Sequence, residues 1–184
     1  RWKRVTGVQT CALPILDVDT LRGNVNTRLR KLDEGQYDAI LLAAAGLKRL
    51  GFDARITAIL EPEESLPAVG QGALGIEIRS GNPELAALLA PLNDPHTAAC
   101  VLAERAMSRR LQGGCQAPIG GYAVVRDARL HLRAFVADLE GIRFFHATAE
   151  GPLDAPEGVG LAAAEDLIRQ GADRLLAELV HRNP

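Results

Sequence analysis

The chain has 184 residues, 47% of them hydrophobic and 24% charged, with a formal net charge of −2. This composition is that of a globular protein and excludes intrinsic disorder. The charge and the 4% aromatic content argue against a nucleic-acid-binding protein. No apolar run reaches the roughly 18 residues needed to span a bilayer. Cys11, Cys100 and Cys115 have neither zinc-ligand nor disulfide spacing, which favours a reducing cytoplasm.

The first fifteen residues, RWKRVTGVQTCALPI, show no helical or strand period and do not have the layout of a signal peptide. Val5–Ile15 resembles the codon-by-codon translation of a common sequencing-adapter oligonucleotide. We therefore expect residues 1–15 to be a non-native or artefactual leader, and Cys11 to take no part in function. The alternative is a flexible native terminus.

Residues 16–92 alternate between strand and helix patterns. Leu16–Val18 predicts a short strand, and the i, i+4, i+7 spacing of apolar residues predicts a helix over Val25–Leu32. The continuous apolar run Asp38–Ala44 is typical of a strand buried on both faces, and a helix is expected over Gly46–Leu50. This order predicts part of an α/β domain.

A linker or hinge, rich in glycine and proline, is expected over Pro62–Gly75. The alternating pattern of Ala73–Arg79 predicts a strand. Asn82-Pro83-Glu84 begins a helix that leads to Leu89, with proline in its first turn. Asp94-Pro95 begins another helix, which runs to Leu111 and is closed by glycines.

Residues 93–184 have the pattern of a small α+β domain. Three β-rich runs, Tyr122–Val125, Leu130–Val136 and Phe144–Thr148, predict an antiparallel meander. A long amphipathic helix is expected over Gly160–Val180. Together with the helix that begins near Asp94, it predicts two helices on one face of a three-stranded sheet.

Basic residues flank the start of the first helix. Asn24 is suited to cap this helix, and Gly23 allows a tight turn before it. Arg22 and Arg28 can converge on the free N–H groups of the helix end, an arrangement suited to carboxylates or phosphates. A capped helix with two solvated arginines is the alternative. Lys48-Arg49 could supply a further anion contact, or be surface charge at a helix C-terminus.

Two glycine-rich loops are further candidate sites. Gly70-Gln71-Gly72 permits close approach of a ligand to the backbone, or a hinge. Cys115 lies in the loop QGGCQAPIG, where the neighbouring Arg109 and Arg110 could stabilise a thiolate; a small buried residue is the alternative. The histidines show no metal spacing, so no metal site is expected.

Four segments, which follow one another along the chain, resemble the sequence of a known family. They are LRGNVNTRLRKLDEGQYDAILLAAAGLKRLG, LPAVGQGALGIE, AERAMSRRLQGGCQAPIG and LAAAEDLIRQGADRLLAEL. From about Leu16 to its end, the chain resembles porphobilinogen deaminases, also called hydroxymethylbilane synthases. This transferase family joins four porphobilinogen units, with release of ammonia, into linear 1-hydroxymethylbilane for tetrapyrrole and heme biosynthesis.

The resemblance implies roles for particular residues. Cys115 matches the cysteine that carries the dipyrromethane cofactor through a thioether. Arg22, Arg28 and Arg49 match arginines that bind the carboxylates of cofactor and substrate, porphobilinogen and the growing polypyrrole. Gly70, Gln71 and Gly72 match a loop near the substrate pocket. The resemblance implies a monomer. From the composition and the cysteines, we expect a cytoplasmic protein with neither nucleic-acid nor membrane partners.

The resemblance also implies a domain organisation. Residues 16–92 match the later part of a periplasmic-binding-protein-like second domain and the crossover to the first. Residues 93–184 match the C-terminal domain that carries the cofactor cysteine. The family's catalytic aspartate lies in the part that this chain lacks, so no catalytic residue can be assigned here. We therefore expect a fragment that is inactive alone. The competing hypothesis is a non-catalytic anion-binding module in which Cys115 is structural.

Overall fold

A computed structural model describes residues 5–6, 18–112, 117–139 and 141–182. The chain divides into two compact units, residues 1–65 with 139–141 and residues 66–138 with 142–184. The predicted division into residues 1–15, 16–92 and 93–184 stays a prediction. Within the described ranges, no helix combines the length and the apolar character needed to cross a membrane.

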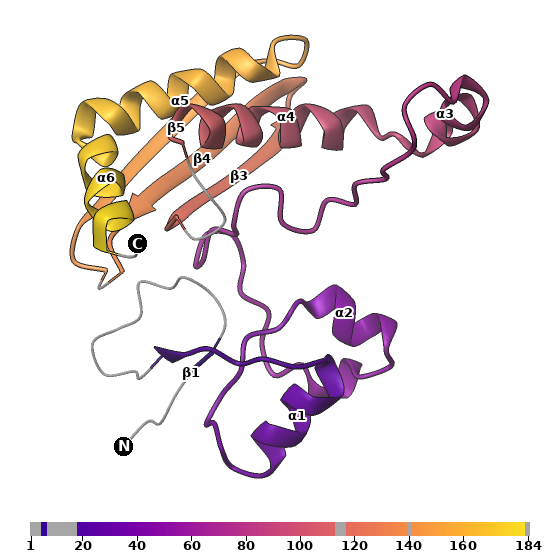
Figure 1. The fold of residues 1–184 in the computed structure, drawn as a ribbon, viewed down its shortest axis with the longest axis vertical. Helices are drawn as coiled ribbons and strands as arrows, with labels where there is room; N and C mark the ends of the chain where they lie inside the picture. Colours follow the sequence, from indigo (N-terminus) through magenta and orange to yellow (C-terminus); the bar gives the residue numbers. More distant parts are fainter. Residues whose placement is uncertain (1–4, 7–17, 113–116, 140, 183–184) are drawn as a thin grey trace. The chain divides into compact units, whose positions relative to one another are not determined.

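The first unit holds two short strands and two helices (Figure 1). Strand β1 (Val5–Thr6) pairs in parallel with β2 (Val18–Asp19). Helix α1 (Val25–Asp33) confirms the predicted helix, and Leu29 is its buried residue. Helix α2 (Ala44–Arg49) is followed by the 3₁₀ turn η1 (Asp53–Arg55).

The expected strand over Asp38–Ala44 is wrong. In the described part of the chain this segment belongs to no sheet, and α2 already begins at Ala44. Its apolar side chains Ile40, Leu41 and Leu42 are only half-buried. A strand is held by hydrogen bonds to a neighbouring strand, and none lies beside this run among the described residues.

The second unit is built on the predicted antiparallel meander. Its strands are β3 (Ile119–Arg126), β4 (Arg129–Ala137) and β5 (Phe144–Pro152), paired in the order β3-β4-β5. The register joins Ala123 to Leu132 and Leu132 to Ala149. Each of the three strands is longer than the corresponding sequence pattern because the pairing continues to both ends of the central strand.

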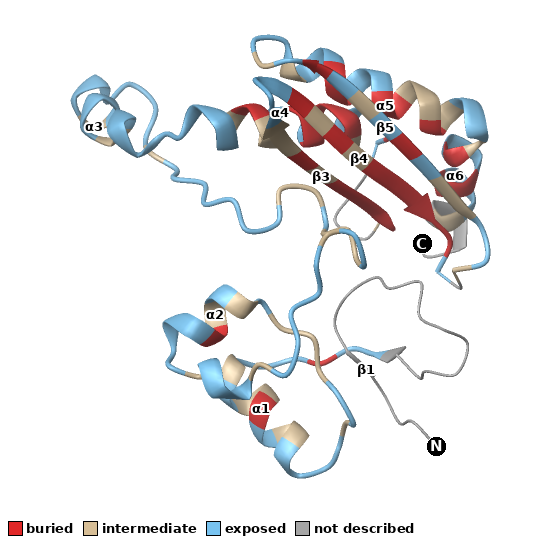
Figure 2. Ribbon diagram, turned by 180° about the vertical axis from the view of Figure 1, so that it is seen from behind, coloured by how far each residue is buried: buried red, intermediate tan, exposed pale blue. Residues whose placement is uncertain are grey.

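Helices α4 (Pro95–Arg110) and α5 (Pro156–Gln170) lie side by side on one face of this sheet (Figure 1). Red segments in Figure 2 mark buried residues along α4, α5 and the three strands. The largest fully buried side chains belong to the hydrophobic core: Met107, Leu130, Leu132, Val136, Leu167 and Leu175. The predicted three-stranded sheet with helices on one face is thus confirmed.

The expected single helix over Gly160–Val180 is wrong, because the structure has two helices here with a break at Gly171. Gly171 adopts a left-handed conformation, φ 104°, and ends α5; a separate helix, α6 (Ala172–Arg182), follows. The continuous amphipathic pattern hid this break, since the positive φ of Gly171 turns the backbone without interrupting the spacing of the leucines. Helix α5 therefore ends in the manner typical of a glycine C-cap.

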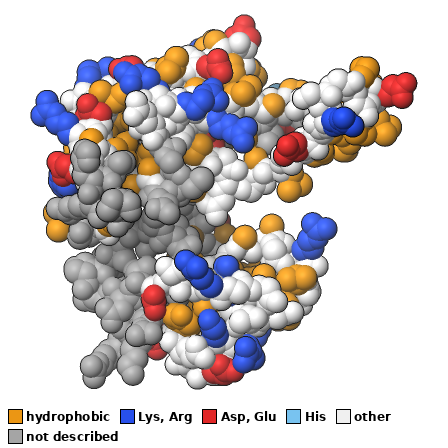
Figure 3. All heavy atoms as spheres, in the orientation of Figure 1, with side chains coloured by type: hydrophobic (Ala, Val, Ile, Leu, Met, Phe, Trp, Pro, Cys, Tyr) orange, Lys and Arg blue, Asp and Glu red, His pale blue; other side chains and the backbone are white. Residues whose placement is uncertain are grey.

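The part of the second unit that precedes α4, from residue 66 to residue 94, has little regular structure. Helix α3 (Pro83–Leu89) and the short 3₁₀ turn η2 (Ala90–Leu92) follow the predicted start at Asn82. The expected strand over Ala73–Arg79 is wrong, because no described strand pairs with it. Leu74 is 96% exposed. Apolar side chains also gather on the surface over α3 (Figure 3), where Leu88 is exposed.

Candidate functional site

The N-terminal end of α1 is shaped by a tight turn and a side-chain cap. Gly23 has φ 120°, a conformation that residues with a Cβ rarely adopt. Asn24 is the N-cap: its Oδ1 accepts a hydrogen bond from the Thr27 N–H at 2.9 Å. Arg28 turns back to this end, and its Nε donates to the Gly23 carbonyl at 2.7 Å. The turn, cap and guanidinium therefore form one local unit.

The start of α1 carries arginine on both sides of its cap. The first turn of α1 contains no acidic residue. Arg22 is exposed, and over the described ranges it forms no ion pair or hydrogen bond. The helix end adds the positive end of its dipole and backbone N–H groups without partners inside the helix. This end of α1 can therefore accept an anion.

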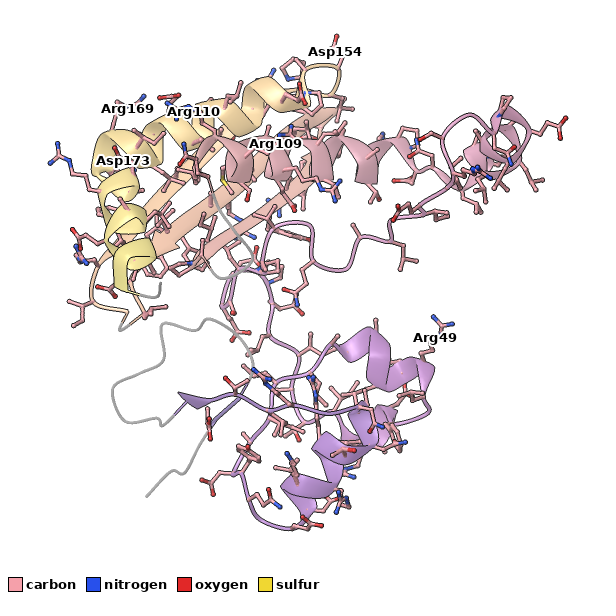
Figure 4. The ribbon with its side chains drawn as sticks, viewed as in Figure 1. Arg49, Arg109, Arg110, Asp154, Arg169 and Asp173 are labelled. Carbon is pink, nitrogen blue, oxygen red and sulfur yellow. The ribbon has the colours of Figure 1, made fainter. Side chains whose placement is uncertain are left out.

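Arg49 lies in the same unit, as the last residue of α2, directly after the exposed Lys48. Figure 4 shows its side chain extending outward from the end of that helix. Among the residues that the structure describes, Arg49 forms no hydrogen bond or ion pair through its side chain. The structure therefore brings Arg22 and Arg28 to one end of α1, while Arg49 stands at the end of another helix.

The second unit contains an open groove of about 560 Å³. One wall is the loop Pro67–Ala73, which includes the three predicted residues Gly70, Gln71 and Gly72. The other walls are the first half of α4 and the edge strand β3, which contribute His96, Cys100, Glu104, Tyr122 and Ala123 among others. The predicted loop thus lies against the sheet in a concave site.

Backbone geometry in this loop requires its glycines. Gly70 has φ 68° and Gly72 has φ 87°, both in the left-handed region. Gln71 closes the turn, because its Oε1 accepts a hydrogen bond from the Ala68 N–H at 3.1 Å and its N–H donates to the Ala68 carbonyl at 3.0 Å. The side-chain oxygen of Gln71 therefore supports the loop itself.

Glu104 is a buried carboxylate at the base of the groove, 6% exposed. It accepts hydrogen bonds from the Gly70 N–H at 2.7 Å and from the Ala123 N–H at 2.8 Å, one on each oxygen. Burial raises the pKa of Glu104, and the two N–H groups oppose that rise. Burial and the Glu104 charge both raise the pKa of Cys100, which favours the thiol over the nucleophilic thiolate.

Cys115 lies outside the described residues. The chain on either side of its loop is held: Leu111 caps α4, and the Pro118 carbonyl accepts from the Ala137 N–H at 3.1 Å. The two arginines expected to assist a thiolate are engaged elsewhere. Arg109 pairs with Glu157 at 3.1 Å and Arg110 with Glu165 at 2.7 Å, both on α5 (Figure 4).

Sequence reasoning missed Glu104. A signal was present, since this acidic residue follows Ala99, Cys100 and Ala103 on the face of α4 that packs on the sheet. A charged residue in an apolar stripe needs partners. The partners themselves, Gly70 and Ala123, could not be read from local spacing because they come from two distant segments.

Two models of one protein family match the chain. The model described as "Porphobilinogen deaminase, dipyromethane cofactor binding domain" matches residues 3–87. The model described as "Porphobilinogen deaminase, C-terminal domain" matches residues 98–169. The second match covers most of α4, the whole meander and nearly all of α5.

Curated relatives agree with these matches. Porphobilinogen deaminase of Thiobacillus denitrificans is 63% identical over 166 residues, which are 90% of this chain and 54% of that protein. The same enzyme of Methylobacillus flagellatus is 55% identical over 168 residues, 91% of this chain and 54% of that protein. The chain spans about half the length of the curated relatives it matches. With both domain models and these identities in agreement, the chain belongs to the porphobilinogen deaminase family.

Proposed function

We propose that this chain supplies the cofactor-bearing part and much of the carboxylate-binding part of a hydroxymethylbilane synthase. The reaction joins four porphobilinogen units head to tail, releases ammonia at each condensation and yields 1-hydroxymethylbilane. The observation that carries this proposal is the end of α1, where Arg22 and Arg28 flank a capped helix start whose first turn contains no acidic residue. Each pyrrole of the substrate bears two carboxylates, which suits such a site.

The residues of this chain fit a covalently bound, polycarboxylate cofactor. Cys115 would carry dipyrromethane through its sulfur, and Arg22 and Arg28 would bind the cofactor's acetate and propionate groups. When bound, this group supplies the pyrrole end to which substrate units are added. Arginine suits the role because its planar fork binds a carboxylate through two hydrogen bonds and stays charged at any physiological pH.

Substrate binding would use the same arginines together with Arg49 and the loop Gly70-Gln71-Gly72. This loop lines the groove, and its two glycines have no side chain to keep a ligand away from the backbone. Residues 16–92 would belong to periplasmic-binding-protein-like domains, and residues 93–184 to the cofactor-bearing domain. We propose a cytoplasmic monomer whose partners are porphobilinogen and the growing polypyrrole, with no nucleic-acid or membrane partner.

A chimera tests this proposal. The matched 166-residue segment of the Thiobacillus denitrificans enzyme is replaced by the corresponding segment of this chain. We expect the purified chimera to form hydroxymethylbilane and to carry dipyrromethane as added intact mass. We expect Cys115→Ser to abolish both, and the matched change Cys100→Ser to leave the adduct in place.

Two results would oppose the proposal. A folded chimera that forms no product would separate this chain from the activity. A folded chimera with no added mass on Cys115 would favour the non-catalytic anion-binding module with a structural cysteine. The 184-residue chain alone is expected to form no hydroxymethylbilane, because no residue in it is assigned the role of the family's catalytic aspartate.

A further inference from the structure

The loop that follows residue 66 is fastened at three points, two on strand β3 and one on helix α4. The Pro67 carbonyl accepts a hydrogen bond from the Gly121 N–H at 3.0 Å, and Ala68 forms an isolated antiparallel bridge with Gly120. The third point is the 2.7 Å hydrogen bond from the Gly70 N–H to Glu104. The first two fastenings join backbone to backbone, whereas the third depends on a side chain.

Glu104 is a costly residue to place where it lies. It is buried beside Ala103 and Met107, which are themselves completely buried, and among the described residues no cation forms an ion pair with it. A carboxylate taken out of water without a cation destabilises the fold unless hydrogen bonds compensate for the lost hydration. An apolar side chain would pack at this position without that cost. We therefore conclude that the carboxylate is there to accept hydrogen bonds from its two N–H donors.

The two donors come from segments that are otherwise separate. Ala123 lies in β3, 19 residues after Glu104, and Gly70 lies in the loop, 34 residues before it. Ala123 is in the edge strand, so its N–H has no strand partner on that side. Gly70 has φ 68°, and its N–H points away from the turn that Gln71 closes. One carboxylate thus satisfies a sheet edge and a loop together.

We propose that Glu104 is a positioning residue, which holds Gly70, and with it the Gly70-Gln71-Gly72 segment, against β3 and thereby sets the shape of the groove. The assignment of this segment to substrate binding rests on the proposed function, whereas the positioning itself does not. Glu104 touches no substrate in this account and acts through the backbone of the loop.

The change Glu104→Gln gives a directional test. An amide has one acceptor oxygen, so it can serve one of the two N–H donors and must turn its NH₂ group toward the other. The bond to Ala123 is the more buried of the two, and an unsatisfied donor costs most there. The amide oxygen should therefore stay with Ala123, and the Gly70 N–H should lose its partner.

Hydrogen exchange of the purified chain measures this difference. We expect exchange at Gly70 to accelerate about tenfold or more in Glu104→Gln, relative to the amides of the central strand β4, while Ala123 keeps most of its protection. The matched control is Glu165→Gln, an exposed glutamate that pairs with Arg110, and it should leave the exchange at Gly70 unchanged. Dividing the exchange rate at Gly70 by the rates in β4 corrects for any general loss of stability in the variant.

Two results would overturn the proposal: unchanged exchange at Gly70 in Glu104→Gln, or equal acceleration at Gly70 and in β4. In the active chimera, Glu104→Gln should also raise the KM for porphobilinogen severalfold more than it lowers kcat, as expected when a binding loop loosens. An unsubstituted chimera that forms no product would refute the proposed function and leave the exchange result to decide the role of Glu104.

Discussion

Gly160 of α5 faces the Ala103 carbonyl of α4 so closely that no side chain fits between them. A Cβ atom built on Gly160 would overlap that carbonyl oxygen and would lie 2.8 Å from the Ala106 Cβ and 2.9 Å from the Met107 nitrogen. The obstacles include backbone atoms, which cannot move without shifting a helix. The distance between the two helices that cover the sheet is therefore set by the absence of one methyl group.

The first prediction follows from this contact. Gly160→Ala should destabilise the second unit by about 2 kcal/mol or more, because either helix must move from a well-packed core. Gly158→Ala is the matched control: it lies in the same helix, and a Cβ there meets nothing within 4 Å. Alanine favours helix over glycine, so this control should be neutral or stabilising by up to ~1 kcal/mol. Urea unfolding checks both, and equal effects would contradict the packing argument.

Local signals predicted much of the fold. The starts of α1, α3 and α4 were all marked by Asn24, Asn82 and Asp94, and each side chain accepts from the N–H three residues later at 2.7–3.0 Å. A cap of this kind lies within one turn of helix, so the sequence alone contains the whole interaction. The meander was likewise predictable, because its strands are neighbours in the chain.

Longer-range features were not predictable. Asp38–Ala44 and Ala73–Arg79 have strand composition, but a strand exists only beside a partner, and sequence pattern does not contain the partner. The role of Glu104 was missed for the same reason, since its donors lie 19 and 34 residues away. In the candidate site, the sequence predicted that Arg22 and Arg28 could bind an anion. It did not predict the hydrogen bond from the Arg28 side chain to the Gly23 carbonyl.

The second prediction concerns the break between α5 and α6. Gly171 has φ 104°, and its N–H donates to the carbonyls of Leu167 and Ile168. Gly171→Ala should lower the free energy of unfolding by about 1 kcal/mol, because a Cβ disfavours this left-handed backbone. Gly171→Asn should cost less, since asparagine tolerates positive φ better. Thermal unfolding of both variants checks the order, which would be reversed if residue size near Phe145 decided the outcome.

The third prediction concerns stability in acid. Burial by itself would raise the pKa of Asp138. Its carboxylate accepts hydrogen bonds from the N–H groups of Arg143, at 3.0 Å, and Ile142, at 2.8 Å. Together with the Arg143 guanidinium, these bonds outweigh burial and hold the pKa below its usual value. The folded state thus binds this proton more weakly than the unfolded state.

The sign of the pH effect follows from that difference. Stability from Asp138 is fully present above its unfolded pKa of 3.8 and is lost as the pH falls through the lower folded value. Asp138→Asn should therefore destabilise the chain at neutral pH and show a smaller loss between about pH 5 and pH 2. The exposed Asp154 provides the control, Asp154→Asn. Parallel stability curves for the chain and Asp138→Asn would contradict the prediction.

The fourth prediction tests the end of α1 as an anion site, with mellitate, a benzene hexacarboxylate, as the probe. Arg22→Ala and Arg28→Ala should each weaken binding about tenfold at low salt, because each removes a charge-assisted contact to a carboxylate. Arg30→Ala is the control: Arg30 lies on the same helix and pairs with Glu34 at 3.1 Å. Titration calorimetry at two salt concentrations measures the affinities, and both the binding and the difference between variants should shrink at high salt.

The control decides what a loss of affinity means. If Arg30→Ala weakened binding as much as Arg22→Ala, the probe would be sensing general positive charge on the unit, and no site at the helix start would be needed. Arg30 is already partly neutralised by Glu34, whereas Arg22 is exposed and has no ion pair over the described ranges. Arg28 is held on the Gly23 carbonyl by a 2.7 Å hydrogen bond. Because the side chain is already ordered, its remaining N–H groups can bind an anion with little further loss of side-chain entropy. If the anion binds at the helix start, Arg22→Ala and Arg28→Ala should weaken binding more than Arg30→Ala. If it senses only the overall positive charge of the unit, the three variants should weaken binding equally.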